Sequence, residues 1–283
     1  MKTRLISSAV AIAIGIGVMV GIFTPVFSVF VMVLSVVAAG EIMTVAGVKS
    51  NLVRVPAMVF SAVIPAYLSV QNSLEFDIPV AAVLSLYVIL MLCLMLKTHE
   101  KTRFEQLTIT LYASIFVPYA FSCVLNIRDV HSTYQGVYTK AEAVYLVLFA
   151  FFCAFFTDSF AYFVGRKFGK HKMAPVISPK KSVEGAVGGL VLSPAFNIAV
   201  FLGVREWVFG GESAISLVFI IVMSVLLSAI SMLGDLSASL LKRNFGVKDF
   251  GKIMPGHGGI MDRFDSCVFV LPVLAAGIKF INI

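Results

Sequence analysis

Apolar stretches of about 20 residues recur along the whole chain, and this repetition constrains the fold more than any other feature of the sequence. A helix of that length spans the ~30 Å hydrocarbon core of a bilayer. Of the 283 residues, 59% are hydrophobic and 13% are charged, whereas soluble domains are about 25% charged. We therefore predict an all-α, polytopic integral membrane protein with about nine transmembrane helices. The expected spans are residues 5–23, 26–46, 53–71, 78–96, 106–126, 143–165, 186–209, 214–241 and 260–281.

The basic residues between these spans indicate the orientation of the chain. Eighteen of the 22 Lys and Arg residues fall on one side of the predicted helices and four fall on the other side. The positive-inside rule places the richer side, and with it the N-terminus, in the cytoplasm. Topology and attraction to anionic lipid heads thus explain the net charge of +7 without nucleic-acid binding. We expect a protein of the cell (inner) membrane whose active site faces the cytoplasm.

The two halves of the chain differ in where their acidic residues lie. Residues 1–140 carry acids only at helix ends and in loops, so we assign the first five helices to a scaffold. Residues 141–283 supply the last four helices, in which four aspartates lie within apolar stretches: Asp158, Asp235, Asp262 and Asp265. A charge at the bilayer centre costs on the order of 2.5–3.5 kcal/mol even on a lenient scale. Three helices that accept this cost indicate one shared polar cavity, and the alternative is a set of structural ion pairs such as Asp262 with Arg243.

Helical spacing supports a cavity that opens toward the cytoplasm. At ~1.5 Å per residue, Asp158 and Asp235 lie about 10 and 12 Å inside the cytoplasmic ends of their helices. Polar residues at spacings of three and four share one face of each helix. These faces carry Ser228, Ser231, Asp235, Ser239 and Lys242 in one helix and Asp158, Tyr162 and Arg166 in the other.

The residue types in this region suit phosphate chemistry with a metal ion. Carboxylates with hydroxyls nearby, and with no His or Cys cluster in the sequence pattern, favour a hard cation such as Mg²⁺. In ISPKKSVEGAVGG (177–189), basic and hydroxyl residues precede a helix start, where phosphates bind readily, although a basic loop at a membrane surface would look similar. In PGHGG (255–259), the glycines can point backbone N–H groups at an anion, and His257 can donate to a phosphate or act as an acid or base. The residues alone indicate a membrane enzyme, or a transporter, that handles phosphates.

A set of motifs in the C-terminal half resembles the signature of the phosphatidate cytidylyltransferase (CDP-diacylglycerol synthase) family. The signature run comprises Ser239-Leu240-Leu241-Lys242-Arg243, Lys248-Asp249, Pro255-Gly256-His257-Gly258-Gly259 and Asp262-Arg263-Phe264-Asp265-Ser266. Three upstream segments are also similar: Gly234-Asp235-Leu236, Asp158-Ser159-x-Ala161-Tyr162-x-x-Gly165-Arg166 and Ser178-Pro179-Lys180-Lys181-Ser182-x-Glu184-Gly185. The sequence departs from the family at Ala238, where many members carry an acid.

The resemblance implies a nucleotidyltransferase of phospholipid biosynthesis that converts CTP and phosphatidic acid to CDP-diacylglycerol and pyrophosphate. It implies Mg²⁺ as the cofactor, K⁺ as a possible second cation and, by analogy, a homodimer. The implied metal ligands are Asp235, Asp262 and Asp265, and Asp158 and His257 complete the implied catalytic set. The implied substrate-binding residues are Arg166, Ser178, Lys180, Lys181, Ser182, Ser239, Lys242, Arg243, Lys248, Asp249 and Arg263.

Two alternatives to this function remain open. One is a related lipid enzyme that uses CTP differently, such as a polyprenol kinase or a synthase acting on an ether-lipid phosphate. The other is an ion-coupled transporter, in which the acids within the membrane would carry the coupling ion. Because transporter sites lie near the midplane of the bilayer, acids gathered toward one face favour an enzyme.

Overall fold

The computed structural model describes residues 2–71, 79–256 and 258–282, and most of these residues are helical. Seven helical segments of the described residues are long and apolar enough to cross a bilayer. They are α2 (Pro25–Val45), α3 (Asn51–Val70), α4 (Val80–Lys97), the run Phe104–Arg128, α8 (Lys140–Phe168), α9 (Val183–Trp207) and α10 (Leu217–Asn244). These segments coincide with the second to eighth predicted spans, so the prediction of a polytopic helical protein is confirmed.

Two further apolar helices lie at the predicted first and last spans. They are α1 (Lys2–Val20) and α12 (Cys267–Ile281). The apolar stretches described for them, Ala9–Val20 and Cys267–Ile281, are shorter than the other seven segments. The count of nine transmembrane helices and the cytoplasmic N-terminus therefore stay predictions.

The chain divides into two compact units. The first contains residues 1–125 and 245–263, and the second contains residues 126–244 and 264–283. The segment 245–263, which carries much of the C-terminal signature, thus belongs with the N-terminal helices. The functional division predicted at residue 140 stays a prediction.

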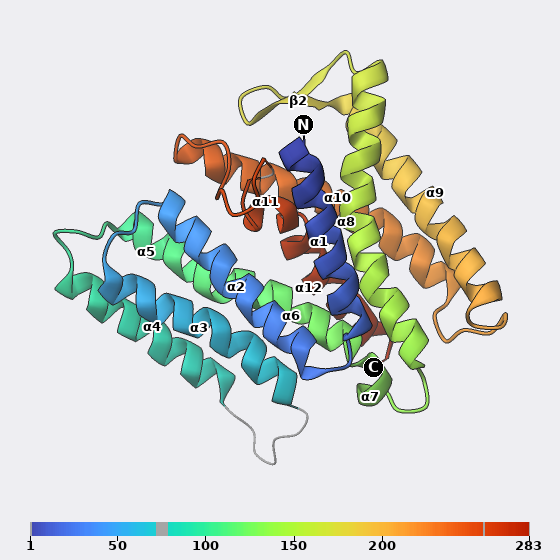
Figure 1. Ribbon diagram of the computed structural model, residues 1–283, viewed down its shortest axis with the longest axis horizontal. Helices are drawn as coiled ribbons and strands as arrows, with labels where there is room; N and C mark the ends of the chain where they lie inside the picture. The colour runs from blue at the N-terminus through green and yellow to red at the C-terminus, as the bar shows by residue number, and fades with distance from the viewer. Residues whose placement is uncertain (1, 72–78, 257, 283) are drawn as a thin grey trace. The chain divides into compact units, whose positions relative to one another are not determined.

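In the first unit, α2 packs against α3, and α5 (Phe104–Leu111) and the π-helical turn η2 (Tyr112–Phe116) contact α2 and α3 (Figure 1). The chain continues from η2 into α6 (Val117–Arg128). Two polar contacts fix this arrangement. The amide of Gln106 donates to the carbonyls of Ala46 at 3.1 Å and Gly47 at 2.9 Å, and the hydroxyls of Tyr87 and Ser114 lie 2.6 Å apart.

The second unit is built on α8, which packs against α9, α10 and α12, and is preceded by the short helix α7 (Val130–Thr133) (Figure 1). A capping box begins α8, because Thr139 and Glu142 bond reciprocally to each other's backbone N–H groups. Glycines then allow α9 to approach α8 closely. A Cβ atom at Gly185 would lie 2.6 Å from the carbonyl oxygen of Ala161, and one at Gly188 would lie 2.6 Å from three carbons of Val164. The glycines that follow the basic segment therefore serve helix packing, as small residues commonly do in membranes.

A short hairpin joins α8 to α9, which the sequence analysis treated as a loop. Strands β1 (Lys172–Ala174) and β2 (Ser178–Ser182) pair antiparallel, with Lys172 opposite Ser182 and Ala174 opposite Ser178. The hairpin is held at its base by Glu184, whose carboxylate accepts the backbone N–H groups of Lys170 and His171. The basic residues of this segment are therefore carried by a defined structure.

The predicted last span, 260–281, is divided into α11 (Met261–Phe264) and α12, with a turn at residues 265 and 266. The physical reason lies in the side chain of Asp265, whose Oδ1 accepts the backbone N–H of Ser266 at 2.9 Å. In a continuous helix this N–H would donate to the carbonyl four residues earlier. The interruption places both polar side chains at the start of α12.

The close approach of α8 and α9 gives a test of the packing. We expect Gly188→Ala to lower the thermal unfolding midpoint in detergent, because the new methyl group overlaps Val164, at a cost of about 1–3 kcal/mol. Gly203→Ala is the matched control, since it lies in the same helix and a Cβ there meets nothing within 4 Å. Equal midpoints for the two variants would contradict this account of the interface.

Candidate active site

A pocket of about 600 Å³ opens in the second unit, where the hairpin faces α8, α9 and α10. Several residues predicted from the sequence line it together: Asp158, Arg166, Ser178, Lys180, Lys181, Ser182 and Asp235. Tyr162, one helical turn from Asp158, also lines the pocket, as its spacing predicted. The structure therefore brings together one acid from α8, one acid from α10 and the basic hairpin.

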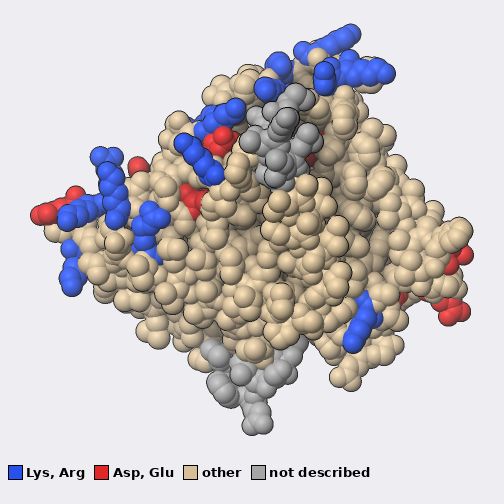
Figure 2. All heavy atoms as spheres, viewed as in Figure 1, with Lys and Arg blue, Asp and Glu red and all other residues tan. Residues whose placement is uncertain are grey.

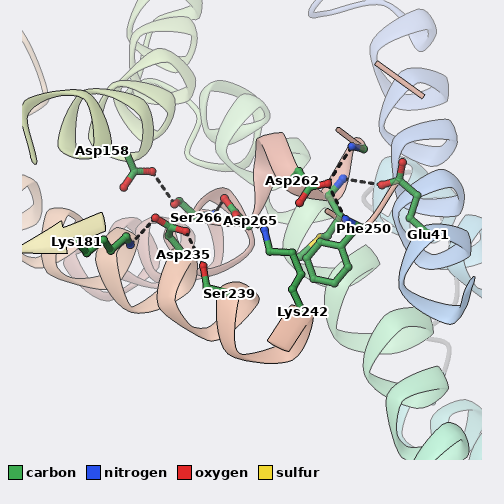
Figure 3. Close-up of polar contacts among 12 residues, drawn as sticks. Glu41, Asp158, Lys181, Asp235, Ser239, Lys242, Phe250, Asp262, Asp265 and Ser266 are labelled. Carbon is green, nitrogen blue, oxygen red and sulfur yellow. Dashed lines mark hydrogen bonds and ion pairs between the residues drawn. The ribbon is translucent and has the colours of Figure 1, made fainter. Parts of the chain in front are cut away.

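Asp235 lies at the centre of the polar contacts in this pocket. Its carboxylate forms an ion pair with the ammonium group of Lys181 from β2, and its Oδ1 accepts the hydroxyl of Ser239 at 3.4 Å (Figure 3). Both side chains of the ion pair are about one quarter exposed. A cation supplied by the hairpin therefore neutralises the carboxylate on the membrane helix.

Asp158 and Asp265 form a second group of contacts, linked through Ser266. The Ser266 hydroxyl donates to Oδ2 of Asp158 at 3.1 Å, and Asp265 forms an ion pair of 3.9 Å with Lys242 (Figure 3). Asp265 and Lys242 are both largely buried. Asp158 and Asp235 line the same pocket, and Asp265 directly precedes the serine that donates to Asp158. The predicted convergence of acids from separate helices is thus observed for these three residues.

The polar face predicted on α10 points into the protein. Ser228 and Ser231 are fully buried, and Ser231 donates to the carbonyl of Ala154 on α8 at 3.2 Å. At the other end of the helix, Nε of Arg243 donates to the carbonyl of Ile177 at 3.2 Å, next to strand β2. The face therefore packs α10 against α8 at its buried end, and Asp235 on the same face contacts the hairpin through Lys181.

Basic side chains gather at the hairpin end of the second unit. Figure 2 shows Lys and Arg over this end and Asp and Glu near the loop between α9 and α10. The side chain of Ser182 caps the start of α9, because its hydroxyl accepts the backbone N–H of Gly185 at 3.1 Å. A positive helix start beside lysines is an arrangement that favours phosphate binding.

The first unit holds the remaining part of the signature in residues 250–256 and 258–262, a loop that leads into the start of α11 and that we call the signature loop. Oδ2 of Asp262 accepts the backbone N–H groups of Phe250 at 2.7 Å and Gly259 at 2.9 Å. Gly256 and Gly258 adopt φ values of +78° and +86°, which other residues rarely adopt. Asp262 thus organises the loop, a role that the sequence analysis did not predict.

The signature loop also binds a residue that the sequence analysis assigned to the scaffold. The carboxylate of Glu41 on α2 accepts the backbone N–H groups of Ile260 at 3.0 Å and Met261 at 2.9 Å. The N–H groups of residues 259–261 therefore donate to carboxylates of the protein, and of these residues only Gly259 belongs to PGHGG, whose anion-binding role stays a prediction. The only signal in the sequence was an acid near the end of an apolar stretch.

The other predicted residues lie in different settings. Lys248, Asp249 and Arg263 are exposed in the first unit. His257 lies outside the described residues, so its predicted role stays a prediction.

The carboxylates of the second unit are of the chemical kind that could hold a magnesium ion together with substrate phosphates. In the part of the chain that the structure describes, no group of three or more His, Cys, Asp or Glu side chains is arranged to hold a metal ion. Mg²⁺ commonly binds through one or two carboxylates together with substrate phosphates. Asp235 and Asp265 supply hard oxygen donors of this kind, and the basic hairpin beside Asp235 can hold the phosphates.

The whole chain is similar to proteins of known type. A model described as the cytidylyltransferase family matches residues 2–281. A Staphylococcus haemolyticus protein named phosphatidate cytidylyltransferase is 33% identical over 282 residues, which is 97% of each chain. A protein of the same name from Staphylococcus aureus is 33% identical over 254 residues, or 88% of each chain. A third, from Staphylococcus saprophyticus, is 45% identical over 160 residues, and this match covers 56% of this chain and 58% of that protein.

The ion pair between Lys242 and Asp265 can be tested by a double-mutant cycle. We expect Lys242→Met and Asp265→Asn each to lower the thermal midpoint, because each leaves a buried partner uncompensated. Asn at position 265 keeps an acceptor for the Ser266 N–H, so Asp265→Asn removes the charge of the side chain without removing this hydrogen bond. The double variant should lose less stability than the two single variants lose together, and the difference should correspond to an interaction energy on the order of 1–3 kcal/mol. Additive effects would show that the two charges do not stabilise each other.

Proposed function

The chain belongs to the cytidylyltransferase family, and on this premise we propose that it is a phosphatidate cytidylyltransferase. A phosphate oxygen of phosphatidic acid attacks the α-phosphorus of CTP. The bond from that phosphorus to the oxygen that bridges to the β-phosphorus breaks, and pyrophosphate leaves with the electron pair. The observation that carries the proposal is the pocket in which Asp158 and Asp235 meet the lysines of the hairpin.

Lysine and arginine side chains of the pocket bind the phosphates in this proposal. Lys180 is exposed beside Lys181, and Arg166 lies at the end of α8 on the same pocket wall. Because Lys181 pairs with Asp235, a triphosphate that binds at the hairpin competes with that carboxylate for the ammonium group. Binding of the nucleotide would then release Asp235 for a metal ion, which couples nucleotide binding to assembly of the site.

Asp235 and Asp265 are the residues of the second unit that we propose as metal ligands. Asp158 lines the pocket with Asp235 and accepts the hydroxyl of Ser266, the residue that follows Asp265. When bound, Mg²⁺ neutralises charge that develops on the phosphates and orients the leaving pyrophosphate. The protein's own contribution is to hold the two reacting phosphates in line, so catalysis is mainly positioning and electrostatic stabilisation. The assignment of Asp262 as a ligand, the second cation K⁺ and the homodimer stay predictions.

A lipid substrate fits the surroundings of this pocket. Tyr162 lines the pocket, and both Tyr162 and its neighbour Phe163 are more than half exposed on a helix long enough to span the bilayer. Exposed aromatic side chains on such a helix contact lipid. Phosphatidic acid can therefore present its phosphate to the pocket while its acyl chains remain in the bilayer.

The proposal also includes the cell membrane as the location and its cytoplasmic face as the side of the site. Several apolar helices support a membrane protein. The distribution of Lys and Arg supports the orientation, because the hairpin carries Lys172, Lys180 and Lys181 on the side that is rich in basic residues. CTP would then reach the pocket from the cytoplasm.

A direct test uses the purified protein in detergent with CTP, phosphatidic acid and Mg²⁺, and detects CDP-diacylglycerol by mass spectrometry. We expect the product with the wild-type protein and a loss of kcat of roughly 100-fold or more in Asp235→Asn, because a ligand of the charged transition state is removed. Glu212→Gln, an exposed acid between α9 and α10, is the control and should retain wild-type kcat.

The alternatives give different outcomes in the same assay. Absence of any CDP-lipid with every divalent metal tried would refute the proposal. Replacement of phosphatidic acid by a polyprenol distinguishes the proposed enzyme from a polyprenol kinase, because the kinase would phosphorylate the polyprenol and form no CDP-lipid.

A further inference from the structure

We propose that Glu41, on α2 of the N-terminal half, is a positioning residue that holds the signature loop in its working conformation. The inference rests on the proposed function, because it assigns the loop a part in the cytidylyl transfer. It gives the N-terminal helices a task beyond scaffolding. Four observations within the first unit support it.

The first observation is the way in which the Glu41 carboxylate divides its two oxygens. Oε1 accepts the N–H of Ile260 at 3.0 Å, and Oε2 accepts the N–H of Met261 at 2.9 Å (Figure 3). Each oxygen thus fixes one of two consecutive peptide groups. Hydrogen bonds to a charged acceptor are roughly twice as strong as neutral ones. The backbone just before Asp262 is therefore held from a helix more than 200 residues away in the sequence.

The second observation is that two glycines of the loop make room for this carboxylate. A Cβ atom at either Gly251 or Gly259 would overlap the carboxyl group of Glu41. Gly259 has no positive φ value, so its backbone conformation does not require glycine. The space taken by Glu41 explains the last glycine of the PGHGG sequence.

The third observation is burial. Glu41 is 6% exposed, near the C-terminal end of a helix whose other buried residues are Phe, Val, Leu, Ile, Met, Ala and Ser. Burying a carboxylate costs several kcal/mol unless it is hydrogen-bonded, and a glutamate on an apolar helix is a candidate functional residue for that reason. α2 and α3 pack through apolar side chains, so the packing of the unit does not require an acid at this position.

The fourth observation is the neighbouring carboxylate. Asp262 accepts the N–H groups of Phe250 and Gly259, so the two acids together hold three consecutive N–H groups, at residues 259–261. Asp262 holds the first of these N–H groups and Glu41 holds the next two, so the backbone that leads into Asp262 is fixed by both carboxylates.

The test compares Glu41→Gln and Glu41→Ala with the same two changes at Glu142. Glu142 is a matched control, because it is 3% exposed and likewise accepts two backbone N–H groups, those of Thr139 and Ala214. It lies at the start of α8 in the other unit and is not part of the proposed site. Gln at position 41 keeps one acceptor oxygen but turns an NH₂ group toward the second N–H, so its defect should be smaller than that of Ala.

Three quantities are measured for each variant: the thermal midpoint, kcat and KM for CTP and phosphatidic acid, and hydrogen–deuterium exchange of the peptide covering residues 250–264. We expect both Glu41 variants to reduce kcat about 10- to 100-fold, the range that loss of a charged hydrogen bond gives. KM should change by less than about threefold, since a misplaced loop mainly removes transition-state stabilisation. Exchange at residues 260 and 261 should accelerate, whereas the Glu142 variants should lower the midpoint and leave kcat of the folded protein within about twofold of the wild type.

Two results separate failure of this inference from failure of the proposed function. If the wild-type protein makes no CDP-diacylglycerol, the proposed function fails. If the wild type is active and the Glu41 variants keep wild-type kcat or wild-type exchange in the 250–264 peptide, the positioning role of Glu41 is wrong.

Discussion

Carboxylates on apolar helices must find compensating donors inside the protein, and the rest of this structure depends on how that requirement is met. The two units meet it in different ways. In the second unit, Asp235 and Asp265 are neutralised by lysine side chains, Lys181 and Lys242. In the first unit, Glu41 and Asp262 accept backbone N–H groups. A lysine side chain can leave its carboxylate partner and pair with a phosphate during a reaction. A backbone N–H cannot move in this way, because its position is set by the peptide group to which it belongs.

This difference assigns different tasks to the two sets of acids. The carboxylates paired with lysines lie at or near the pocket, where phosphates of both substrates can compete for the same cations. The carboxylates bound to peptide groups determine the conformation of the signature loop. The packing of α9 against α8 helps to position the lysines. The glycines of α9 bring its capped start next to α8, and this fixes the hairpin that carries the lysines.

The sequence predicts the helical membrane fold well, because hydrophobic length is a property of each segment by itself. Spacing likewise predicts the inward face of α10, since residues at intervals of three and four share a helix face. The cost of a charge in the membrane and the common depth of the acids predict the meeting of Asp158, Asp235 and Asp265, although the same argument also included Asp262, which lies in the first unit. Three features escape this reasoning because they depend on contacts between distant residues or on local backbone bonds. They are the pairing of β1 with β2, the turn at Asp265, and the contact of Glu41 with a loop near residue 260. The contact of Glu41 shows that an acid near a helix end can carry no distinct signal in the sequence and still organise a loop.

In the proposed reaction, the cytidylyl group, with the α-phosphorus of CTP, moves to the lipid phosphate. The most direct measurement is the fate of each phosphorus when the purified protein is given phosphatidic acid and CTP labelled with ³²P at either the α or the γ position. The account predicts that the α label appears in the chloroform-extractable lipid and that the γ label appears in pyrophosphate. Transfer of the γ label to lipid would identify a kinase and contradict it.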